Sequence, residues 1–461
     1  MELNYYEETL IKNSQLPDVW QSQRSLDELL EFLQFNWEQR SVFYDDGEVT
    51  SRQQFLTFTG QKGVRTRKYI GTIVFKGQQL NIFPKVFRTD IDDTDTSELS
   101  LKHLMLNLVQ WLQYCDTMNY PFIHMTSELD DSSDLKELFV TLYVRYVKNA
   151  IDRGLFYRYE EETEESSVIR GHLDLKDYFT RKYPAGKHNK FLCTYSNFEV
   201  DNALNRIIKY TCKFLLKDAS KANQKTIRHI LVKLNEVSDV RCSPIDCDNL
   251  ILSRLHKHYS VVLSMSKMFL LNKTASYRLD DSESFCFLFP TDLLFEGFVG
   301  GFLKDIMQNK ARVRLQASEL TLINDIEYAG QSLGKAFTMK HDILLEHREH
   351  GMFILDTKYK QLKRFEGSKD LKKSITDEVK QEDLYQVIEY ASHRCLSDVY
   401  LLYPLYRHEC VEPHNPVLLR DTVAGNQKIR IHLVRLPFVF EEDTEDTKRK
   451  LTTVLNNLFP S

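Results

Sequence analysis

The stretch GMFILDTK, residues 351–358, decides how the C-terminal part of this 461-residue chain folds. Its unbroken apolar run is typical of a strand that is buried on both faces of a sheet. Because alternate side chains of a strand share a face, Asp356 and Lys358 point the same way and Thr357 points away. A carboxylate and an ammonium group on such a strand are costly to bury unless they are paired or bind something charged. We therefore expect a charged site at the end of this strand.

A second acidic residue, Asp342, lies in a comparable stretch with apolar runs on both sides. The polar segment between the two stretches, residues 346–351, ends in glycine and predicts a hairpin loop. Pairing of the two strands would bring Asp342 and Asp356 close together. Their carboxylates and the backbone carbonyl of Thr357 are hard oxygen ligands, which suit Mg²⁺ or Mn²⁺ and not Zn²⁺.

Such a metal site predicts hydrolysis of phosphodiesters, in which the metal generates hydroxide from water and neutralises charge in the transition state. Lys358 would orient or deprotonate the attacking water, or stabilise the scissile phosphate. The alternative is a surface hairpin with a salt bridge, and Asp342, Asp356 and Lys358 alone do not separate the two interpretations.

The segments upstream favour the site. Residues 289–296 (FPTDLLFE) predict the start of a helix that continues as a mostly apolar segment through Met307. Glu296 is a lone acid on this helix, and its apolar neighbours indicate burial rather than an exposed helix glutamate.

The segments downstream complete an ordered set of elements. Residues 377–391 predict a helix on which Gln386 and Tyr390, four positions apart, share a face. Residues 398–403 predict the last strand. The resulting order, helix–strand–strand–strand–helix–strand, carries acidic residues where metal-dependent phosphodiester chemistry requires them.

A basic segment follows the acidic strand. Between residues 358 and 373 the chain holds seven basic residues, Lys358, Lys360, Lys363, Arg364, Lys369, Lys372 and Lys373. One interpretation is a loop that contacts DNA phosphates, since basic residues displace counterions from a nucleic-acid backbone. The other is a solvated linker. The position of the segment beside the acidic strand favours the first.

Composition excludes several classes. A hydrophobic content of 42%, a charged content of 28% and a net charge of −5 describe a soluble globular protein without a global basic field. The eight cysteines are scattered and do not form a zinc motif, which indicates reduced thiols of a cytosolic protein. We find no secretion signal, no apolar run long enough to span a membrane and no Gly-rich phosphate loop of an NTPase.

The chain is long enough for several domains, and we expect an α/β protein that is α+β in its overall, multidomain organisation. Residues 1–96 predict a β-rich N-terminal domain with a hairpin of residues 69–75 and 79–83. Residues 97–279 predict a mainly helical middle region, and residues 280–461 the domain with the acidic strands. The basic segment 60–68 is either a projecting element or a solvated turn.

Four stretches, in this order, resemble one known family. They are LNIFPK (residues 80–85), IRGHLD (169–174), residues 198–208 with Asp201 and Asn205, and the acidic set with LFE (294–296) and ILDTKYK (354–360). The chain resembles the McrC subunit of McrBC-type modification-dependent restriction endonucleases, which belong to the PD-(D/E)xK nuclease superfamily. The resemblance spans most of the chain.

The resemblance implies a bipartite enzyme of phage defence. A McrB-like hexameric AAA+ GTPase would recognise double-stranded DNA carrying 5-methylcytosine and translocate. This chain would supply the nuclease, a restriction-endonuclease-like core, and its N-terminal part would dock onto the ring and stimulate GTP hydrolysis. The catalytic positions of the family match Asp342, Asp356 and Lys358 here, and its auxiliary positions match Glu296, Gln386 and Tyr390. Glu296 would join Asp342, Asp356 and the Thr357 carbonyl as a metal ligand. His341 stands where the motif has proline.

We therefore expect a Mg²⁺-dependent endonuclease subunit in the prokaryotic cytoplasm, with residues 60–68 as the candidate docking loop. One alternative is a stand-alone nuclease of repair or recombination, which would cleave without a partner or GTP. Another is a non-catalytic scaffold that activates a motor. The intact set of Asp342, Asp356 and Lys358 disfavours the scaffold, because a degenerate core has no chemical reason to retain buried charge.

Overall fold

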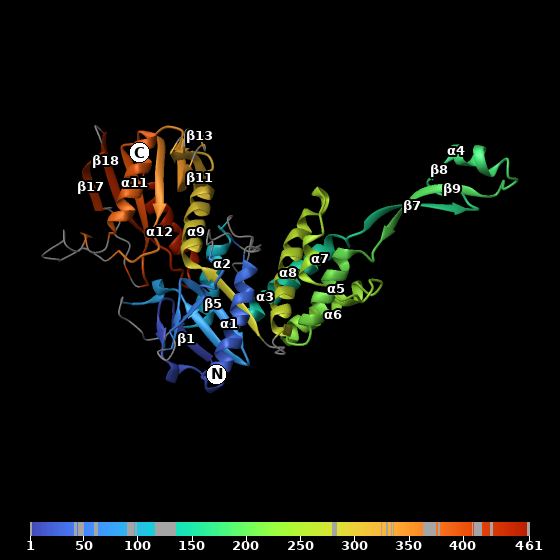
Figure 1. Ribbon diagram of the computed structural model, residues 1–461, viewed down its shortest axis with the longest axis horizontal. Coiled ribbons are helices and arrows are strands. Elements are labelled where there is room, and N and C mark those ends of the chain that lie inside the picture. Colours follow the sequence, from blue (N-terminus) through green and yellow to red (C-terminus); the bar gives the residue numbers. More distant parts are fainter. Residues whose placement is uncertain are drawn as a thin grey trace. The chain divides into compact units, whose positions relative to one another are not determined.

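The computed structural model describes most of the chain (Figure 1). The residues outside the description are 1, 41–43, 45–49, 60–62, 90–95, 97–98, 116–134, 279–283, 324, 329–330, 333, 335, 363–374, 377–378, 408, 410–416, 425–426 and 459–461. None of the described helices is both long and apolar enough to cross a membrane.

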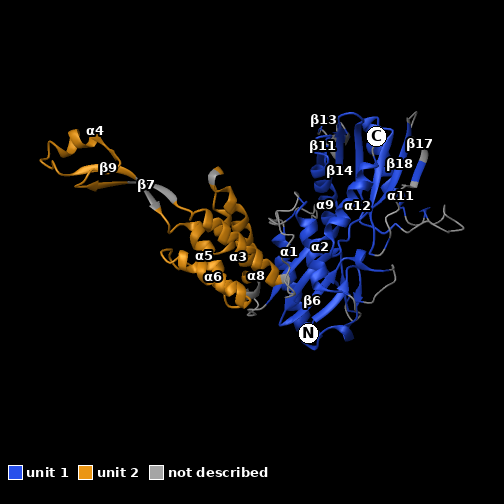
Figure 2. Cartoon of the chain, turned by 180° about the vertical axis from the view of Figure 1, so that it is seen from behind, with its two compact units in different colours: residues 1–133, 283–461 blue, residues 134–282 orange. Residues whose placement is uncertain are grey.

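The chain divides into two compact units (Figure 2). Unit 1 combines residues 1–133 with residues 283–461, and unit 2 is formed by residues 134–282. This division differs from the expected boundaries at 96 and 280, because the two ends of the chain form one unit and residues 97–133 belong to it. Hydrogen bonds across unit 1 give the reason, since Trp111 donates to the carbonyl of Phe438 and Asn107 to that of Phe440.

The N-terminal part of unit 1 contains a four-stranded sheet in the order β1 (Glu2–Tyr6), β6 (Gln78–Phe83), β5 (Tyr69–Phe75) and β10 (Phe285–Pro290). The predicted hairpin of β5 and β6 is confirmed. β10, which we expected in the C-terminal domain, pairs with β5 and joins the two ends of the chain. Beside this sheet lie α1 (Gln23–Glu38) and a three-stranded sheet of β2 (Leu10–Ile11), β4 (Val64–Thr66) and β3 (Leu56–Phe58).

The C-terminal part of unit 1 contains a six-stranded sheet. Its order is β11 (Ala311–Ile323), β14 (Ala336–His347), β15 (Gly351–Thr357), β16 (Asp398–Pro404), β18 (Gln427–Leu436) and β17 (Val417–Ala424). β15, β16 and β18 are parallel and the outer pairs are antiparallel. A short β12 (Glu327–Tyr328) and β13 (Gln331–Ser332) lie between β11 and β14 in the chain.

The helices of unit 1 are α2 (Leu101–Leu112), α9 (Thr291–Ile306), α11 (Gln381–Arg394) and α12 (Thr444–Asn456). The predicted order of elements is confirmed as α9–β11–β14–β15–α11–β16. The predicted last strand, β16, is not the last, because β17, β18 and α12 follow it.

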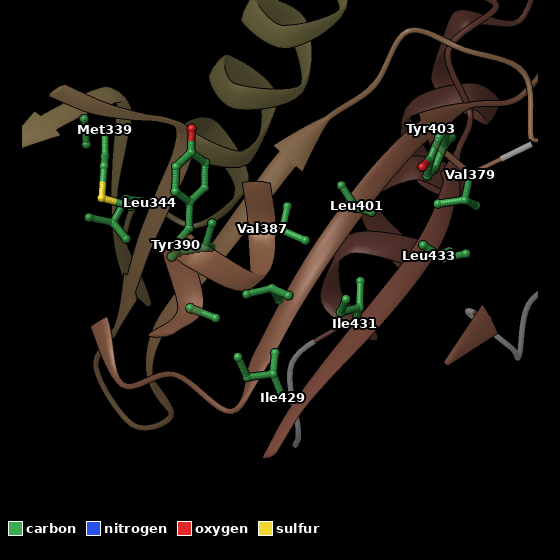
Figure 3. Close-up of a cluster of buried hydrophobic side chains, with 14 of the residues drawn as sticks. Met339, Leu344, Val379, Val387, Tyr390, Leu401, Tyr403, Ile429, Ile431 and Leu433 are labelled. Atoms are coloured by element: carbon green, nitrogen blue, oxygen red, sulfur yellow. The ribbon is translucent and has the colours of Figure 1, made fainter. Parts of the chain in front are cut away.

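One face of the six-stranded sheet packs against α11 (Figure 3). Val387 of the helix lies beside Leu401 of β16, and Tyr390 lies beside Leu344 of β14. Leu344 of β14 belongs to the same buried cluster. Because side chains two positions apart in a strand share a face, this packing also turns Asp342, two residues before Leu344, toward α11.

Unit 2 is mainly helical. Its helices are α3 (Leu135–Arg153), α5 (Ala203–Leu215), α6 (Lys221–Lys233), α7 (Pro244–Asp248) and α8 (Ser260–Arg278). Between α3 and α5 the chain forms an arm, residues 158–199, in which β7 (Arg158–Ser166) and β8 (His172–Leu173) both pair with β9 (Phe191–Glu199). The short α4 (Leu175–Asp177) and a π-helical turn (Tyr178–Lys182) complete this arm (Figure 1).

The Asp201 and Asn205 pattern lies at the base of the arm. The Asn205 amide donates to the carbonyls of Phe156 and Val200, both at 2.8 Å, and so joins the two ends of the arm. Asp201 accepts two hydrogen bonds from Arg206, at 2.7 and 3.0 Å. These residues therefore hold the arm on the helices.

Candidate active site

The hairpin of β14 and β15 brings the two predicted acids together. Its register pairs Leu344 with Ile354, and Thr357 donates from both its backbone nitrogen and its hydroxyl to Oδ2 of Asp342, each at 2.8 Å. Thr357 and Asp342 are thus held at the end of the strand that carries Asp356. This arrangement was expected from the two apolar runs and the glycine-terminated loop between them.

Asp356 is almost completely buried, with 1% of its surface exposed. Nζ of Lys358 lies 2.7 Å from its Oδ2, which confirms that the two side chains share a face. Apart from this ion pair, the carboxylate accepts no hydrogen bond from the residues that the structure describes. A buried carboxylate normally accepts several hydrogen bonds. The oxygen atoms of Asp356 therefore have lone pairs available to bind a ligand.

Glu296 completes the group of acids from α9. The side-chain amide of Gln316, on β11, donates to Oε1 of Glu296 at 3.2 Å. Burial, followed by the charge of Asp342, raises the pKa of Glu296 to about 7. The lone acid of the predicted helix thus lies close enough to the hairpin to interact with it electrostatically.

The hairpin acids are perturbed in the same direction. Burial raises the pKa of Asp356 to about 7, with the charge of Asp342 as the second cause. Burial also raises the pKa of Asp342, although the two hydrogen bonds from Thr357 and the charge of Lys358 act against it. Burial alone would lower the pKa of Lys358, but the neighbouring Asp356 carboxylate raises it on balance.

The donor set fits a hard divalent cation. Mutually repelling carboxylates with unused oxygen atoms are what such an ion neutralises. Among the described residues, no group of three or more Asp, Glu, His or Cys side chains is arranged to hold a metal ion. The site therefore suits an ion that binds one or two carboxylates and completes its coordination shell with water and substrate oxygens, as Mg²⁺ commonly does.

The pair of Gln386 and Tyr390 forms a relay from the lysine to the neighbouring strand. Nζ of Lys358 donates to Oε1 of Gln386 at 3.0 Å, and the Gln386 amide donates to the Tyr390 hydroxyl at 2.8 Å. The Tyr390 hydroxyl donates in turn to the carbonyl of Lys340 at 2.8 Å, two residues before Asp342. This relay fixes Lys358 relative to β14. His341, which replaces the motif's proline, is buried and packs edge-on against the Tyr390 ring.

Two further polar residues at the site were not predicted. Asp383, in the first turn of α11, is buried and pairs with Nζ of Lys360 at 2.6 Å and lies 3.9 Å from Nζ of Lys358. Its position three residues before Gln386, on the same helix face, was the only available signal. Tyr403 of β16 is buried, and its hydroxyl has no hydrogen-bond partner among the described residues. Burial, followed by the charges of Asp383 and Asp356, raises its pKa.

The predicted DNA-contacting residues are only partly described. Lys360 is held in its ion pair with Asp383, and its contact with DNA stays a prediction. The remaining members of the set, Lys363, Arg364, Lys369, Lys372 and Lys373, lie outside the described residues.

The candidate docking segment, residues 60–68, is described only in part, and its contact with a partner stays a prediction. Residues 60–62 are outside the description, and Val64–Thr66 form β4, which pairs with β2 on one side and β3 on the other. Lys68 is tied to Asp292 at 2.7 Å. None of the seven described cysteines is in a disulfide bond.

Fold and site together define the class: an α/β protein of two units, with an acidic cluster and a lysine at the end of a mixed sheet. The fold is similar to that of a chain in the refined half-complex from the tetradecameric assembly of Thermococcus gammatolerans McrB AAA+ hexamers with bound McrC. The TM-score is 0.67 and the sequence identity 15%, and the match covers 99% of this chain and 100% of that chain. This chain also matches a chain of the T. gammatolerans McrBC complex, solved by cryo-EM, with a TM-score of 0.48, 18% identity and coverage of 67% and 88%. No curated protein sequence matches it.

The family follows from a separate observation. The family model described as McrBC 5-methylcytosine restriction system component matches residues 64–404. Because this match covers most of the chain, the chain belongs to that family and is a McrBC-type subunit.

Proposed function

We propose that this chain is the McrC-like nuclease subunit of a GTP-dependent restriction complex, and that it hydrolyses DNA phosphodiesters with Mg²⁺. The observation that carries the proposal is the cluster of Asp342, Asp356 and Lys358 at the end of β15, with unused oxygens on a carboxylate that is 1% exposed. A protein gains no stability from such a carboxylate, since burial works against its ionised form.

The roles of the residues follow from their contacts. Asp342 and Asp356, with the Thr357 carbonyl, would hold the metal, and Glu296 would approach from α9. A bound Mg²⁺ would make water a stronger nucleophile and offset charge on the phosphate in the transition state. Lys358, held by Gln386 at 3.0 Å, would orient the attacking water or contact the scissile phosphate.

Asp383 and Tyr390 support this arrangement from α11. Asp383 holds Lys360 next to the site, and Tyr390 ties the relay to the strand of Asp342. Because a metal or substrate ligand is effective only when it is held in place, these residues would contribute to the cleavage rate without contacting the DNA.

We further propose that the arm of unit 2 contacts a McrB-like AAA+ GTPase. The chain that this protein resembles is part of an assembly of McrB AAA+ hexamers with bound McrC. The arm exposes five large apolar side chains to solvent, which is unfavourable unless a partner covers them: Val168, Ile169, Leu175, Phe179 and Tyr183. Exposed apolar residues gathered on one element are typical of a protein contact.

The deciding experiment is cleavage of plasmid DNA that carries 5-methylcytosine, in the presence of Mg²⁺. The chain is tested alone and with a McrB-like AAA+ GTPase and GTP, and unmethylated plasmid serves as the substrate control. We expect cleavage only in the complete mixture and its loss in Lys358→Ala.

The other outcomes identify the alternatives. Cleavage by the chain alone would favour a stand-alone nuclease. Stimulation of GTP hydrolysis without cleavage, by both the native protein and Lys358→Ala, would favour a scaffold that activates the motor.

A further inference from the structure

A buried carboxylate far from the site in sequence touches the segments that carry the site. Glu7 follows β1 and has 0% of its surface exposed. Its Oε1 accepts from the backbone nitrogen of Lys85 and from the hydroxyl of Tyr359, both at 2.9 Å, and its Oε2 accepts from the hydroxyl of Thr291 at 2.8 Å. Burial raises the pKa of Glu7, although the charge of Lys85 and these hydrogen bonds act against it. The carboxyl group is thus held by three partners from three different segments.

Two of these partners lead directly to the site. Tyr359 is the residue after Lys358, and Thr291 is the first residue of α9, which carries Glu296. The Tyr359 ring also packs against Phe295, the neighbour of Glu296, with ring centroids 6.0 Å apart. The end of β15 and the start of α9 therefore meet on one carboxylate from the other end of the chain.

The third partner fixes Glu7 itself. Lys85 belongs to the LNIFPK stretch, and its backbone nitrogen cannot move without moving the end of β6. Its ammonium group pairs with the neighbouring Glu8 at 2.8 Å and lies 4.8 Å from the Tyr359 ring centroid. Glu7 is thus anchored to the N-terminal sheet by its hydrogen bond from Lys85.

We propose that Glu7 is a positioning residue of the nuclease site, which sets Lys358 through Tyr359 and Glu296 through Thr291. The inference rests on the proposed function. It assigns Glu7 no contact with DNA or metal.

The substitutions separate positioning from stability. Tyr359→Phe removes one hydroxyl and leaves the ring in place. Its matched control is Tyr400→Phe, which removes another buried hydroxyl, bonded to the carbonyl of Leu458 at 2.9 Å. Glu7→Ala removes all three contacts. Glu7→Gln is the conservative variant, because an amide can still accept from Lys85 and Tyr359 and can donate to Thr291, and Glu8→Gln is its control.

The first measurement is single-turnover cleavage at saturating DNA in the complete complex, with DNA affinity measured separately. Residues that orient groups of a metal site commonly change activity by about 10- to 100-fold. We expect Tyr359→Phe to lower the rate by about 10-fold at unchanged affinity, Glu7→Ala to lower it further, and Glu7→Gln to restore most of it. Tyr400→Phe and Glu8→Gln should cleave at the native rate.

The second measurement does not depend on activity. Hydrogen exchange of the folded chain should be faster in Tyr359→Phe at residues 356–360, and unchanged in unit 2. Native cleavage rates for Tyr359→Phe, or a loss equal to that of Tyr400→Phe, would overturn the inference. If the native protein does not cleave DNA, the proposed function fails. Hydrogen exchange then tests whether the hydrogen bond between Glu7 and Tyr359 orders residues 356–360. Faster exchange of these residues in Tyr359→Phe would support this role of Glu7, and unchanged exchange would overturn it.

Discussion

Asp356 works against the stability of the protein, so its neutral analogue should be more stable. The carboxylate is 1% exposed, and burial together with Asp342 raises its pKa from the ordinary 3.8 to about 7. A change of this size costs the folded state up to about 4 kcal/mol at neutral pH, since each pKa unit is worth about 1.4 kcal/mol. We expect Asp356→Asn to recover part of this, on the order of 1 to 3 kcal/mol, because the amide loses the ion pair with Lys358.

The sign of the pH dependence follows from the direction of the shift. Between the ordinary pKa and about 7 the folded protein binds more protons at Asp356 than the unfolded chain does, so stability falls as the pH rises through this window. The native protein thus carries the full cost above pH 7 and little of it near pH 4. The advantage of Asp356→Asn should be largest at pH 8 and nearly absent at pH 4.5.

The assay is urea unfolding at pH 4.5, 6 and 8 in the presence of a chelator, with DNA cleavage measured in parallel. Asp201→Asn is a control of opposite sign. Its hydrogen bonds with Arg206 hold the pKa of Asp201 below its usual range, and this stabilises the fold above the ordinary pKa. That variant should be less stable at pH 8. A less stable Asp356→Asn at pH 8, or an advantage independent of pH, would refute the reasoning.

Three further predictions concern the Gln386–Tyr390 relay, the ion pair of Asp383 with Lys360, and the arm. Tyr390→Phe removes the hydroxyl that joins Gln386 to the carbonyl of Lys340, and should lower the single-turnover cleavage rate by about 10-fold without changing DNA affinity; an unchanged rate would exclude the relay. Asp383→Asn releases Lys360 and should tighten DNA binding while slowing cleavage, as seen by titration of labelled duplex at two salt concentrations. Phe179→Ser on the arm should abolish stimulation of GTP hydrolysis and leave the melting temperature within about 2 °C, whereas stimulation at the native level would place the contact elsewhere.

The acidic hairpin was predictable because its signals are local. Apolar runs, a glycine-terminated loop and the alternation of side chains are enough to place Asp342, Asp356 and Lys358 together. The relay of Gln386 and Tyr390 was predictable in part, since a spacing of four puts both on one helix face. That the chain of contacts ends on the carbonyl of Lys340 depends on how α11 packs on the sheet.

The domain boundaries were not predictable in this way. A composition change near residue 96 marks a break in the chain, but β10 returns to pair with β5 and closes unit 1 across more than 200 intervening residues. The pairing of β4, within the basic segment 60–68, with both β2 and β3 was likewise not visible in the sequence. Charged residues indicate that a segment is exposed to solvent, but they do not show which strands it pairs with, because those partners lie elsewhere in the chain.

The sequence by itself determined the family resemblance, the order of elements around the site and the acids of the hairpin, because each depends on residues only a few positions apart. Only the tertiary structure decided that Glu7 lies under Tyr359, that Asp383 holds Lys360 and that residues 158–199 form an arm. These features join residues separated by up to 352 positions. No local pattern encodes such a contact, because it is fixed by the packing of the whole unit.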